Sequence, residues 1–491
     1  MTDETPEAPV TPDEVDRPAI GVDQWVASAE ERSERAGGLG GWVSRGWNKS
    51  PPSTKLIGFI AIASTLPFWM NEGDLFTYGL YTLLFAMLAL GLNVTVGFAG
   101  LLDLGYVAFY LIGAYGYALL SSNHYGIHWQ AEFSIPVVVA GTALVGLLLG
   151  LTSRRLLGDY LAIVTLFFGQ AAVVFVNTAN PKIAGKGLTG GSNGIPGVDP
   201  LNFFGFKLHS TKQYYFFLLI VFSLAMVALY FLNASRTGRS WRALREDPLA
   251  AETMSIPVNR LKIMAFMFGA GTAGLTGCIF AAIQTGVVAG NFDVALLITL
   301  YAMVILGGLG SIAGALVGAF VINVSTQFLA PSNDHPELKR WLFYGAIILI
   351  VSRIRPWPKL AALVGGTIAF GFVFHAIMGA VDSSWTAGSA VDAGSAATGI
   401  EHWVMIPKGH GGFDTWAYII LVVLIVACSQ VKGWWRIGLL IPTLYWTAIV
   451  WENVLIEQPA VTALILFGAM LIALMQARPQ GLLGTTRVEI V

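Results

Sequence analysis

The sequence predicts an all-α fold, a polytopic transmembrane helical bundle with about fourteen spans. Hydrophobic residues make up 55% of the 491 positions and charged residues only 12%, and the mean hydropathy is +0.67. A water-soluble core cannot bury that much apolar surface, so lipid has to cover a large part of the chain. Apolar runs long enough to cross the hydrocarbon layer follow one another, and basic residues gather in alternate connections between them.

The predicted elements begin after a polar segment. Residues 1–50 carry many acidic side chains and prolines and have little to bury, which predicts a disordered tail in the cytosol. Because a basic start and a small-residue cleavage pattern are missing, we expect an uncleaved first span rather than a signal peptide. We expect a core over 56–355, an additional set of spans over 356–477 and a cytosolic tail over 478–491. The predicted spans begin near Leu56, Leu75, Leu101, Phe133, Tyr160, Tyr214, Ile263, Ala295, Ile312, Trp341, Leu360, Trp416, Ile437 and Ala460.

Clusters of basic residues predict the orientation, because all of them fall on one side of the counted spans. By the positive-inside rule that side is the cytosol, which would hold both termini of a multi-pass protein of the cell membrane. The other side receives residues 177–213, 331–339 and 382–414, which contain fewer arginines. The basic clusters lie at 45–55, 154–155, 236–262, 353–359, 432–436 and 478–487.

A polar island over 236–262, RTGRSWRALREDPLAAETMSIPVNRLK, interrupts the apolar runs. Asp247 suits a helix N-cap and Pro248 the first helical position, and Pro257 predicts the end of this short helix. Its apolar side chains either lie on lipid headgroups or dock to another protein, and small alanines are poor membrane anchors. The predicted surface is formed by Leu249, Ala250, Ala251, Thr253, Met254 and Ile256, flanked by Glu246 and Glu252.

Small residues at helical spacing predict close helix packing in lipid. An alternative interpretation of the segment GGLGSIAGA, Gly307 to Ala315, is a helix break along a transport pathway. The two predicted ridges are Gly310, Gly314 and Gly318, and Gly269, Ala273 and Gly277.

Polar side chains near span ends are candidates for that pathway, because an ionisable group at membrane depth is costly. A capped helix end or an interfacial position explains each of them equally well. Asp103 stands among glycines and fits a discontinuous helix whose ends could meet a zwitterionic substrate. The candidates are Asn93, Asp103, Asp159 and Asp293.

Several stretches resemble one family in the same order: GLNVTVGFAGLLDLGYVAFYLIGAY (Gly91 to Tyr115), GDYLAIVTLFFG (Gly158 to Gly169), LTGGSNGIPG (Leu188 to Gly197), the run from Arg245 to Gly277, and GGLGSIAGA. The ending RPQGLLG, Arg478 to Gly484, resembles that family's C-terminal signature. The chain thus resembles the membrane subunits of branched-chain amino acid ABC importers, the LivM-like permeases. The resemblance implies a second permease subunit, two cytosolic ATP-binding subunits, an external substrate-binding protein and an amino acid substrate.

The resemblance also implies roles for particular residues. An ATPase-coupling surface, a substrate pathway among broken helices and an external loop facing the binding protein or the substrate entrance are expected. The coupling residues would be Glu246, Asp247, Pro248, Ala250, Ala251, Glu252 and Met254; the pathway residues Asn93, Asp103, Gly307, Gly308 and Gly310; the external-loop residues Thr189, Gly190, Gly191 and Asn193.

The sequence departs from the family pattern at two places. Ser255 stands where related loops usually carry glycine, so the bend of the loop is formed differently. Residues 356–477 stand between the core and the terminal RPQGLLG, where related permeases run straight on, and this insertion has no assigned role.

Several classes of site are not predicted. No GxxxxGK[ST] motif occurs, so ATP would have to be bound by other chains. The string GKGLTG, Gly185 to Gly190, matches GxGxxG but lacks the strand before it and the helix after it. The histidines His375, His402 and His410 lack the spacing of a helical metal site, and we expect no catalytic residue, metal, cofactor or nucleic-acid partner.

The sequence leaves one alternative function open and disfavours two others. A urea or short-amide ABC importer permease shares the same loops and remains open as the alternative. An ion-coupled secondary transporter would show paired charges at membrane depth and a repeat of spans, and few such charges and no clear repeat occur. A membrane-embedded enzyme is disfavoured because no cluster of His, Asp or Cys residues is apparent.

Overall fold

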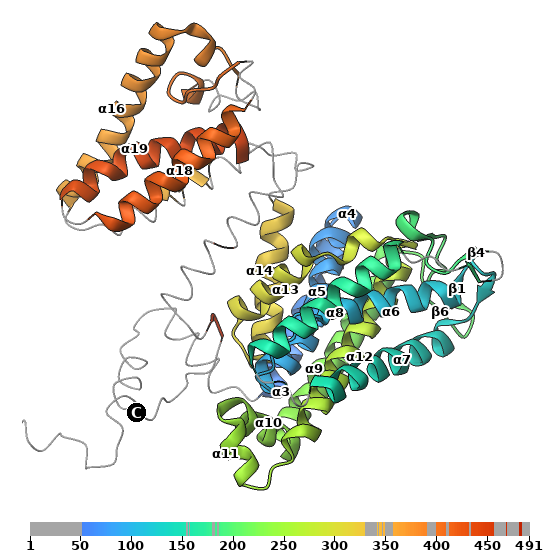
Figure 1. The fold of residues 1–491 in the computed structure, drawn as a ribbon. Coiled ribbons are helices and arrows are strands. Elements are labelled where there is room, and N and C mark those ends of the chain that lie inside the picture. Colours follow the sequence, from blue (N-terminus) through green and yellow to red (C-terminus); the bar gives the residue numbers. More distant parts are fainter. Residues whose placement is uncertain are drawn as a thin grey trace, which may run out of the picture. The chain divides into compact units, whose positions relative to one another are not determined.

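The computed structural model describes mainly residues 52–153, 158–178, 186–328, 357–389, 399–408, 412–431, 434–455 and 481–483, with isolated positions between them (Figure 1). The predicted tail over 1–50 and the span near Ala460 therefore lie outside the described residues. Contacts divide the chain into two units, Met1–Trp69 and Met70–Val491. The first unit contributes helix α3, Pro52–Trp69.

The second unit begins with one continuous helical stretch, built from α4 (Glu72–Asp74), η2 (Leu75–Leu80), α5 (Tyr81–Leu92) and η3 (Asn93–Phe98). The following helices are α6 (Tyr106–Leu120), α7 (Ala131–Ser153), α8 (Asp159–Thr178), α9 (Thr211–Ala234), α10 (Arg236–Glu246), α11 (Pro248–Thr253), α12 (Val258–Gln284), α13 (Val294–Gly307) and α14 (Ile312–Phe328). Two-residue strands pair in antiparallel fashion: β1 (Ser121–Ser122) with β2 (Ile127–His128), β3 (Lys182–Ile183) with β4 (Lys186–Gly187), β5 (Ile195–Pro196) with β8 (Gly286–Val287), and β6 (Asn202–Phe203) with β7 (Phe206–Lys207).

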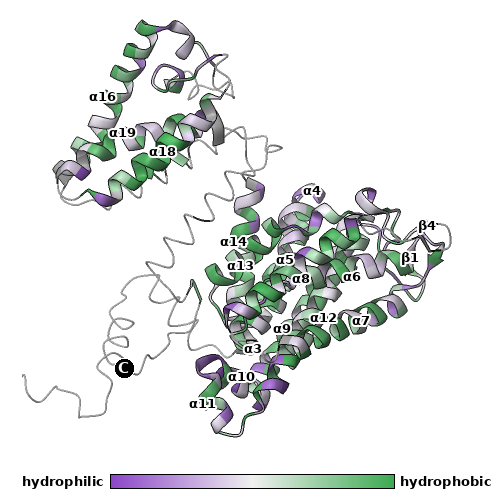
Figure 2. Cartoon of the chain, in the orientation of Figure 1, coloured by the Kyte–Doolittle hydropathy of each residue, from purple (hydrophilic) through white to green (hydrophobic). Residues whose placement is uncertain are grey.

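These helices run along a common direction, and their connections gather at two opposite ends (Figure 1). The short strands occupy one end, which we call the strand end. The helices α10 and α11 project from the other, which we call the α11 end. Figure 2 shows hydrophobic residues along the long helices and hydrophilic residues concentrated in α10 and α11. Helix α12 packs against α5, α6 and α7 and forms the middle of the bundle.

Glycines allow the closest helix approaches, as the two predicted ridges require. A Cβ atom on Gly277 would overlap the carbonyl oxygen of Tyr110 in α6, and one on Gly314 would overlap that of Gly307 in α13. Gly310 differs from the prediction, because it lies before α14 with φ +82 and forms part of the turn that follows α13. The glycine-rich stretch therefore allows α14 to pack closely on α13 and also interrupts the helix between them.

Seven described helices are long and apolar enough to cross a membrane, and four shorter apolar helices accompany them. This agrees with an all-α polytopic bundle, while the total of about fourteen spans stays a prediction. Two starts differ by five residues from the prediction: α12 begins at Val258 and not near Ile263, and α6 begins at Tyr106 and not near Leu101. The late start of α6 is the one that the backbone explains. The reason is local, because Gly100 has φ +68 and the chain stays non-helical as far as Gly105.

The helices of the predicted insertion include α16 (Trp357–Val381), α18 (Phe413–Gln430) and α19 (Trp434–Val450), and α19 packs against both others. Their core is aromatic, with Tyr445 fully buried among Phe370, Phe374 and Trp403. Phe343 stacks on Trp451 at 3.8 Å between ring centroids. Phe343 precedes these helices in the sequence and packs with them.

Replacing Gly318 by alanine is expected to destabilise the α13–α14 hairpin, because the new Cβ would overlap the carbonyl oxygen of Met303. Overpacking of this kind costs about 1–3 kcal/mol. The apparent melting temperature of the purified protein, followed by tryptophan fluorescence, should fall by several degrees. The matched control is Gly365→Ala in α16, where nothing lies within 4 Å of the added Cβ. Equal melting temperatures for the two variants would contradict the close packing.

Candidate coupling site and the adjacent helix breaks

Helix α10 is fixed to the bundle by one large side chain. Trp241 is fully buried, and its indole N–H donates to the carbonyl oxygen of Leu261 in α12 at 3.0 Å. Ser235 caps the start of α10, where its hydroxyl accepts from the amide of Gly238 at 3.3 Å. A buried indole needs such a partner, so the bond determines how α10 lies on α12. The projecting part of the chain is therefore anchored on α12 through Trp241.

Helix α11 has the start that its sequence predicts. The Asp247 carboxylate accepts hydrogen bonds from the amides of Leu249 at 2.8 Å and Ala250 at 3.1 Å, and Pro248 takes the first helical position. The helix ends at Thr253, which is earlier than the expected stop at Pro257. Ser255 has φ +61, a left-handed conformation that costs a non-glycine residue about 1–2 kcal/mol. The loop thus bends at a serine held in a left-handed conformation, at the position where related loops usually carry glycine.

The exposed side of α11 carries two large apolar side chains. Leu249 is 73% exposed and Met254 is 78% exposed, whereas Ala251 is buried against the chain itself. Ala250, Glu246, Asp247 and Glu252 are exposed and Pro248 is partly exposed. Exposed large apolar groups that lie close together mark an interaction surface more often than scattered single residues do. Of the predicted coupling residues, Ala251 therefore faces inward and the others lie at or near the surface.

Arg245, at the end of α10, connects this projection to the bundle. Its Nη1 donates a hydrogen bond to the carbonyl oxygen of Gly97 in η3. A Cβ on Gly100 would lie 2.8 Å from the Arg245 Cγ, and one on Gly310 would lie 2.9 Å from its Nη1. Gly100 and Gly310 both have positive φ, so glycine is required there for backbone conformation as well as for space. The arginine thus lies between two breaks in the helices.

Asn93, at the start of η3, bonds to the second of these breaks. Its Oδ1 accepts from the Gly310 amide at 2.8 Å, and its Nδ2 donates to the Ser311 carbonyl oxygen at 3.2 Å. The side chain is buried. Both ends of the Asn93 amide are therefore engaged with the turn between α13 and α14. Four of the predicted pathway residues, Asn93, Gly307, Gly308 and Gly310, come together here, at the α11 end of the bundle.

The turn after α13 is contacted from a distant part of the sequence. The amides of Leu482 and Leu483 donate to the carbonyl oxygens of Leu306 and Gly307, both at 2.9 Å. These two leucines belong to the RPQGLLG segment. The sequence analysis assigned that segment to a cytosolic tail over 478–491 and did not predict the contact.

Asp103 lies in the connection between η3 and α6. It is fully buried; its Oδ1 accepts from the Gly105 amide at 3.0 Å, and its Oδ2 has no hydrogen-bond partner. The Tyr301 hydroxyl of α13 donates to the Asp103 backbone carbonyl at 2.7 Å. The first contact is that of a turn residue. A turn explains neither the bond from the distant Tyr301 nor the unpartnered carboxylate oxygen.

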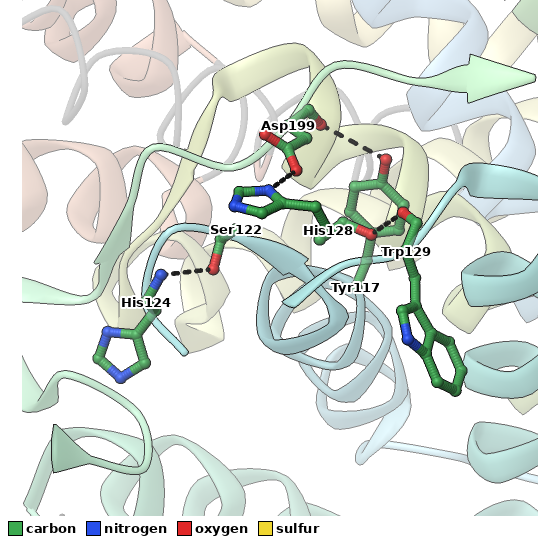
Figure 3. Close-up of polar contacts among 7 residues, drawn as sticks. Tyr117, Ser122, His124, His128, Trp129 and Asp199 are labelled. Atoms are coloured by element: carbon green, nitrogen blue, oxygen red, sulfur yellow. Dashed lines mark hydrogen bonds and ion pairs between the residues drawn. The ribbon is translucent and has the colours of Figure 1, made fainter. Parts of the chain in front are cut away.

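A polar cluster holds the strand end together (Figure 3). His128 Nδ1 pairs with Asp199 Oδ2, and the Tyr117 hydroxyl donates to the Asp199 carbonyl oxygen at 3.4 Å. The Asp199 amide donates in turn to the Ser121 carbonyl at 2.8 Å. These bonds join the β1–β2 hairpin to the segment after β5. The connections at the strand end are therefore joined to one another by hydrogen bonds.

The predicted external-loop residues lie at the strand end, but their polar groups are partly used. Thr189 is buried, and its hydroxyl donates to the carbonyl oxygen of Val176 at 2.7 Å. Gly190 and Gly191 both have positive φ, and Asn193 is exposed in the short helix that follows. The GxGxxG string contributes to the β3–β4 hairpin, which does not provide the strand and helix of a nucleotide fold.

The helices define a polytopic membrane protein. Residues 75–352 match the family described as "Branched-chain amino acid transport system / permease component", and the chain belongs to this family. It is 34% identical over 325 residues to the high-affinity branched-chain amino acid transport system permease protein LivM of Escherichia coli (strain K12), covering 61% of this chain and 73% of that protein. No solved structure matches this chain.

More distant similarity extends to other permeases. The chain is 27% identical over 282 residues to the probable branched-chain amino acid transport permease protein LivH of Methanocaldococcus jannaschii, covering 56% of this chain and 86% of that protein. It is 24% identical over 286 residues to the high-affinity branched-chain amino acid transport system permease protein BraD of Pseudomonas aeruginosa, covering 54% of this chain and 88% of that protein. The matched family region ends before α16.

Proposed function

We propose that this chain is the membrane-spanning permease subunit of an ATP-binding cassette importer for branched-chain or related amino acids. The observation that supports this best is α11, a short capped helix that exposes Leu249 and Met254 and whose base is anchored on α12 through Trp241. A helix of this kind can receive a push from another protein and pass it to the bundle. The family membership supports the substrate class.

The α11 end faces the cytosol in this proposal, and the strand end faces outward. Arg236, Arg239, Arg242 and Arg260 lie at the α11 end, which agrees with the positive-inside rule. Two ATP-binding subunits would dock on α11, a second permease subunit would complete the pathway, and a substrate-binding protein would meet the strand end near Asn193. Closure of the ATPases would move α11 and shift the helices between two arrangements.

The substrate pathway is proposed to run past the breaks at Asn93, Asp103 and Gly307–Gly310. Because the Asn93 side chain is engaged with the turn, we assign it to holding the break rather than to binding substrate. The Asp103 carboxylate, which keeps one unpartnered oxygen, is the better candidate for meeting an ammonium group.

The helices α16, α18 and α19 are proposed to be additional membrane spans. Helix α16 is 25 residues long, and its side chains Ile368, Phe372 and Ile377 are about half exposed. Apolar side chains exposed around a helix of that length are expected to contact lipid.

The test is purification of the chain from cells that also produce the proteins encoded beside it, followed by reconstitution into proteoliposomes. We expect two ATP-binding subunits to be recovered with it and ATP-dependent uptake of leucine, isoleucine or valine in the presence of the binding protein. Uptake of urea or a short amide instead would favour the alternative importer. Full transport activity of the chain on its own would contradict the ABC assignment.

A further inference from the structure

The C-terminal end of α13 has carbonyl groups that its own helix cannot satisfy. The last four carbonyls of any α-helix lack an intrahelical partner. In α13 the Gly308 amide donates to the Val304 carbonyl at 2.9 Å. The Leu306 and Gly307 carbonyls are instead satisfied by the amides of Leu482 and Leu483, again at 2.9 Å. A segment far along the chain thus contributes two hydrogen bonds to the cap of this helix.

The approach of the two segments depends on a pair of glycines. Gly481 is buried with φ +81, and Gly308 has φ +115. A Cβ on Gly481 would lie 2.5 Å from the Cα of Gly308 and 2.8 Å from the carbonyl oxygen of Ile305. No side chain fits between the backbones, so the contact is specific for glycine at position 481.

The turn that receives this cap is also held from its other side. Asn93 bonds to Gly310 and Ser311, and the Arg245 guanidinium lies beside Gly310. The turn Gly308–Ser311 is therefore contacted by η3, by the end of α10 and by the Gly481–Leu483 segment. The contacts from η3 and from the end of α10 are connected to α11, because Arg245 lies just before α11 and bonds to Gly97 of η3.

We propose that Gly481–Leu483 is a clamp that positions the α13–α14 turn, so that movement of α11 through Arg245 shifts these helices instead of loosening the end of α13. The effect on transport rests on the proposed function, whereas the contact itself does not depend on it. Since the segment follows residues 356–477, the clamp also returns the chain to the core after the additional helices.

Hydrogen exchange followed by mass spectrometry tests the contact on the full-length protein in lipid nanodiscs. We expect peptides covering 481–483 to exchange on the order of tenfold or more slowly than an unstructured peptide, because their amides are bonded. The variant Gly481→Ala should abolish this protection and speed exchange at 308–311. Protein whose 481–483 amides exchange at the unstructured rate, or a Gly481→Ala variant that keeps them protected, would overturn the clamp.

The matched control is Gly412→Ala, which adds the same Cβ at a glycine with φ +91 and nothing within 4 Å. It should leave exchange at 308–311 and 481–483 unchanged. In the reconstituted importer, Gly481→Ala should lower the amount of substrate moved per ATP hydrolysed severalfold, with the KM for substrate unchanged. An unchanged ratio despite lost protection would overturn the positioning role. The exchange result stands even if the assembled protein carries a different substrate.

Discussion

The variant Arg245→Ala is expected to lower ATP-driven uptake about tenfold or more while ATP hydrolysis by the attached subunits continues. The guanidinium donates to the Gly97 carbonyl and fills the space between Gly100 and Gly310. A hydrogen bond to a charged group contributes about 1.5–3 kcal/mol, and 1.4 kcal/mol corresponds to a factor of ten. Uptake of radiolabelled leucine and phosphate release, measured on the same proteoliposomes, give the ratio that this prediction concerns.

A suitable control removes the same charge from the same helix. Arg242 is exposed in α10, so Arg242→Ala should leave the ratio of uptake to hydrolysis within about twofold, the usual range for surface changes. Arg245→Lys should fall between the two, because an ammonium can replace one donor but not the planar shape. If Arg245→Ala transports as well as Arg242→Ala does, Arg245 is not part of the coupling path.

The local features of the coupling site could be predicted because they depend on neighbours in sequence. An aspartate before a proline specifies the start of α11, and the Asp247 carboxylate caps the amides of Leu249 and Ala250 as such residues do. The sequence also shows Ser255 where related loops usually carry glycine. The structure shows its consequence, a serine held at φ +61.

The junction at Arg245 could not be predicted in the same way. Its partner Gly97 is 148 positions away in the sequence. An arginine near the end of a span is first interpreted as a sign of which end faces the cytosol. Asn93 was singled out as a polar group at membrane depth, but its role depends on Gly310 and Ser311, which only the packing of α5 against α14 brings near. A helix break was one of two interpretations of the glycine-rich segment Gly307 to Ala315, and close packing was the other. Its position at the α11 end follows from the direction of the chain.

Sequence patterns also predicted helix bounds and side-chain directions wrongly where an apolar run does not coincide with a helix. Residues from Leu101 onward are apolar enough for a span, yet the backbone at Gly100 and the Asp103 turn delay α6 until Tyr106. Ala251 likewise belongs to the apolar set of α11 but turns toward the chain itself. Hydropathy reports composition, whereas the direction of a side chain depends on the neighbouring helix.

The double variant Leu249→Asp with Met254→Asp is expected to prevent recovery of ATP-binding subunits with this chain. Burying a leucine or methionine side chain contributes about 1.5–3 kcal/mol, so loss of two such contacts corresponds to a hundredfold or greater drop in affinity. Introduced carboxylates would add the cost of desolvating a charge. Affinity purification through this chain, with the bound subunits measured by mass spectrometry, gives the result directly.

The control is Phe204→Asp, since Phe204 is 89% exposed in the β6–β7 turn at the strand end. It makes a similar apolar-to-acidic change on the opposite end of the bundle and should leave recovery of the ATP-binding subunits intact. The comparison also separates the two interpretations of α11. If its apolar residues rest on lipid headgroups, the double variant should weaken membrane contact and leave the subunits bound. Retention of the ATP-binding subunits by the double variant would therefore favour the lipid-surface interpretation over docking.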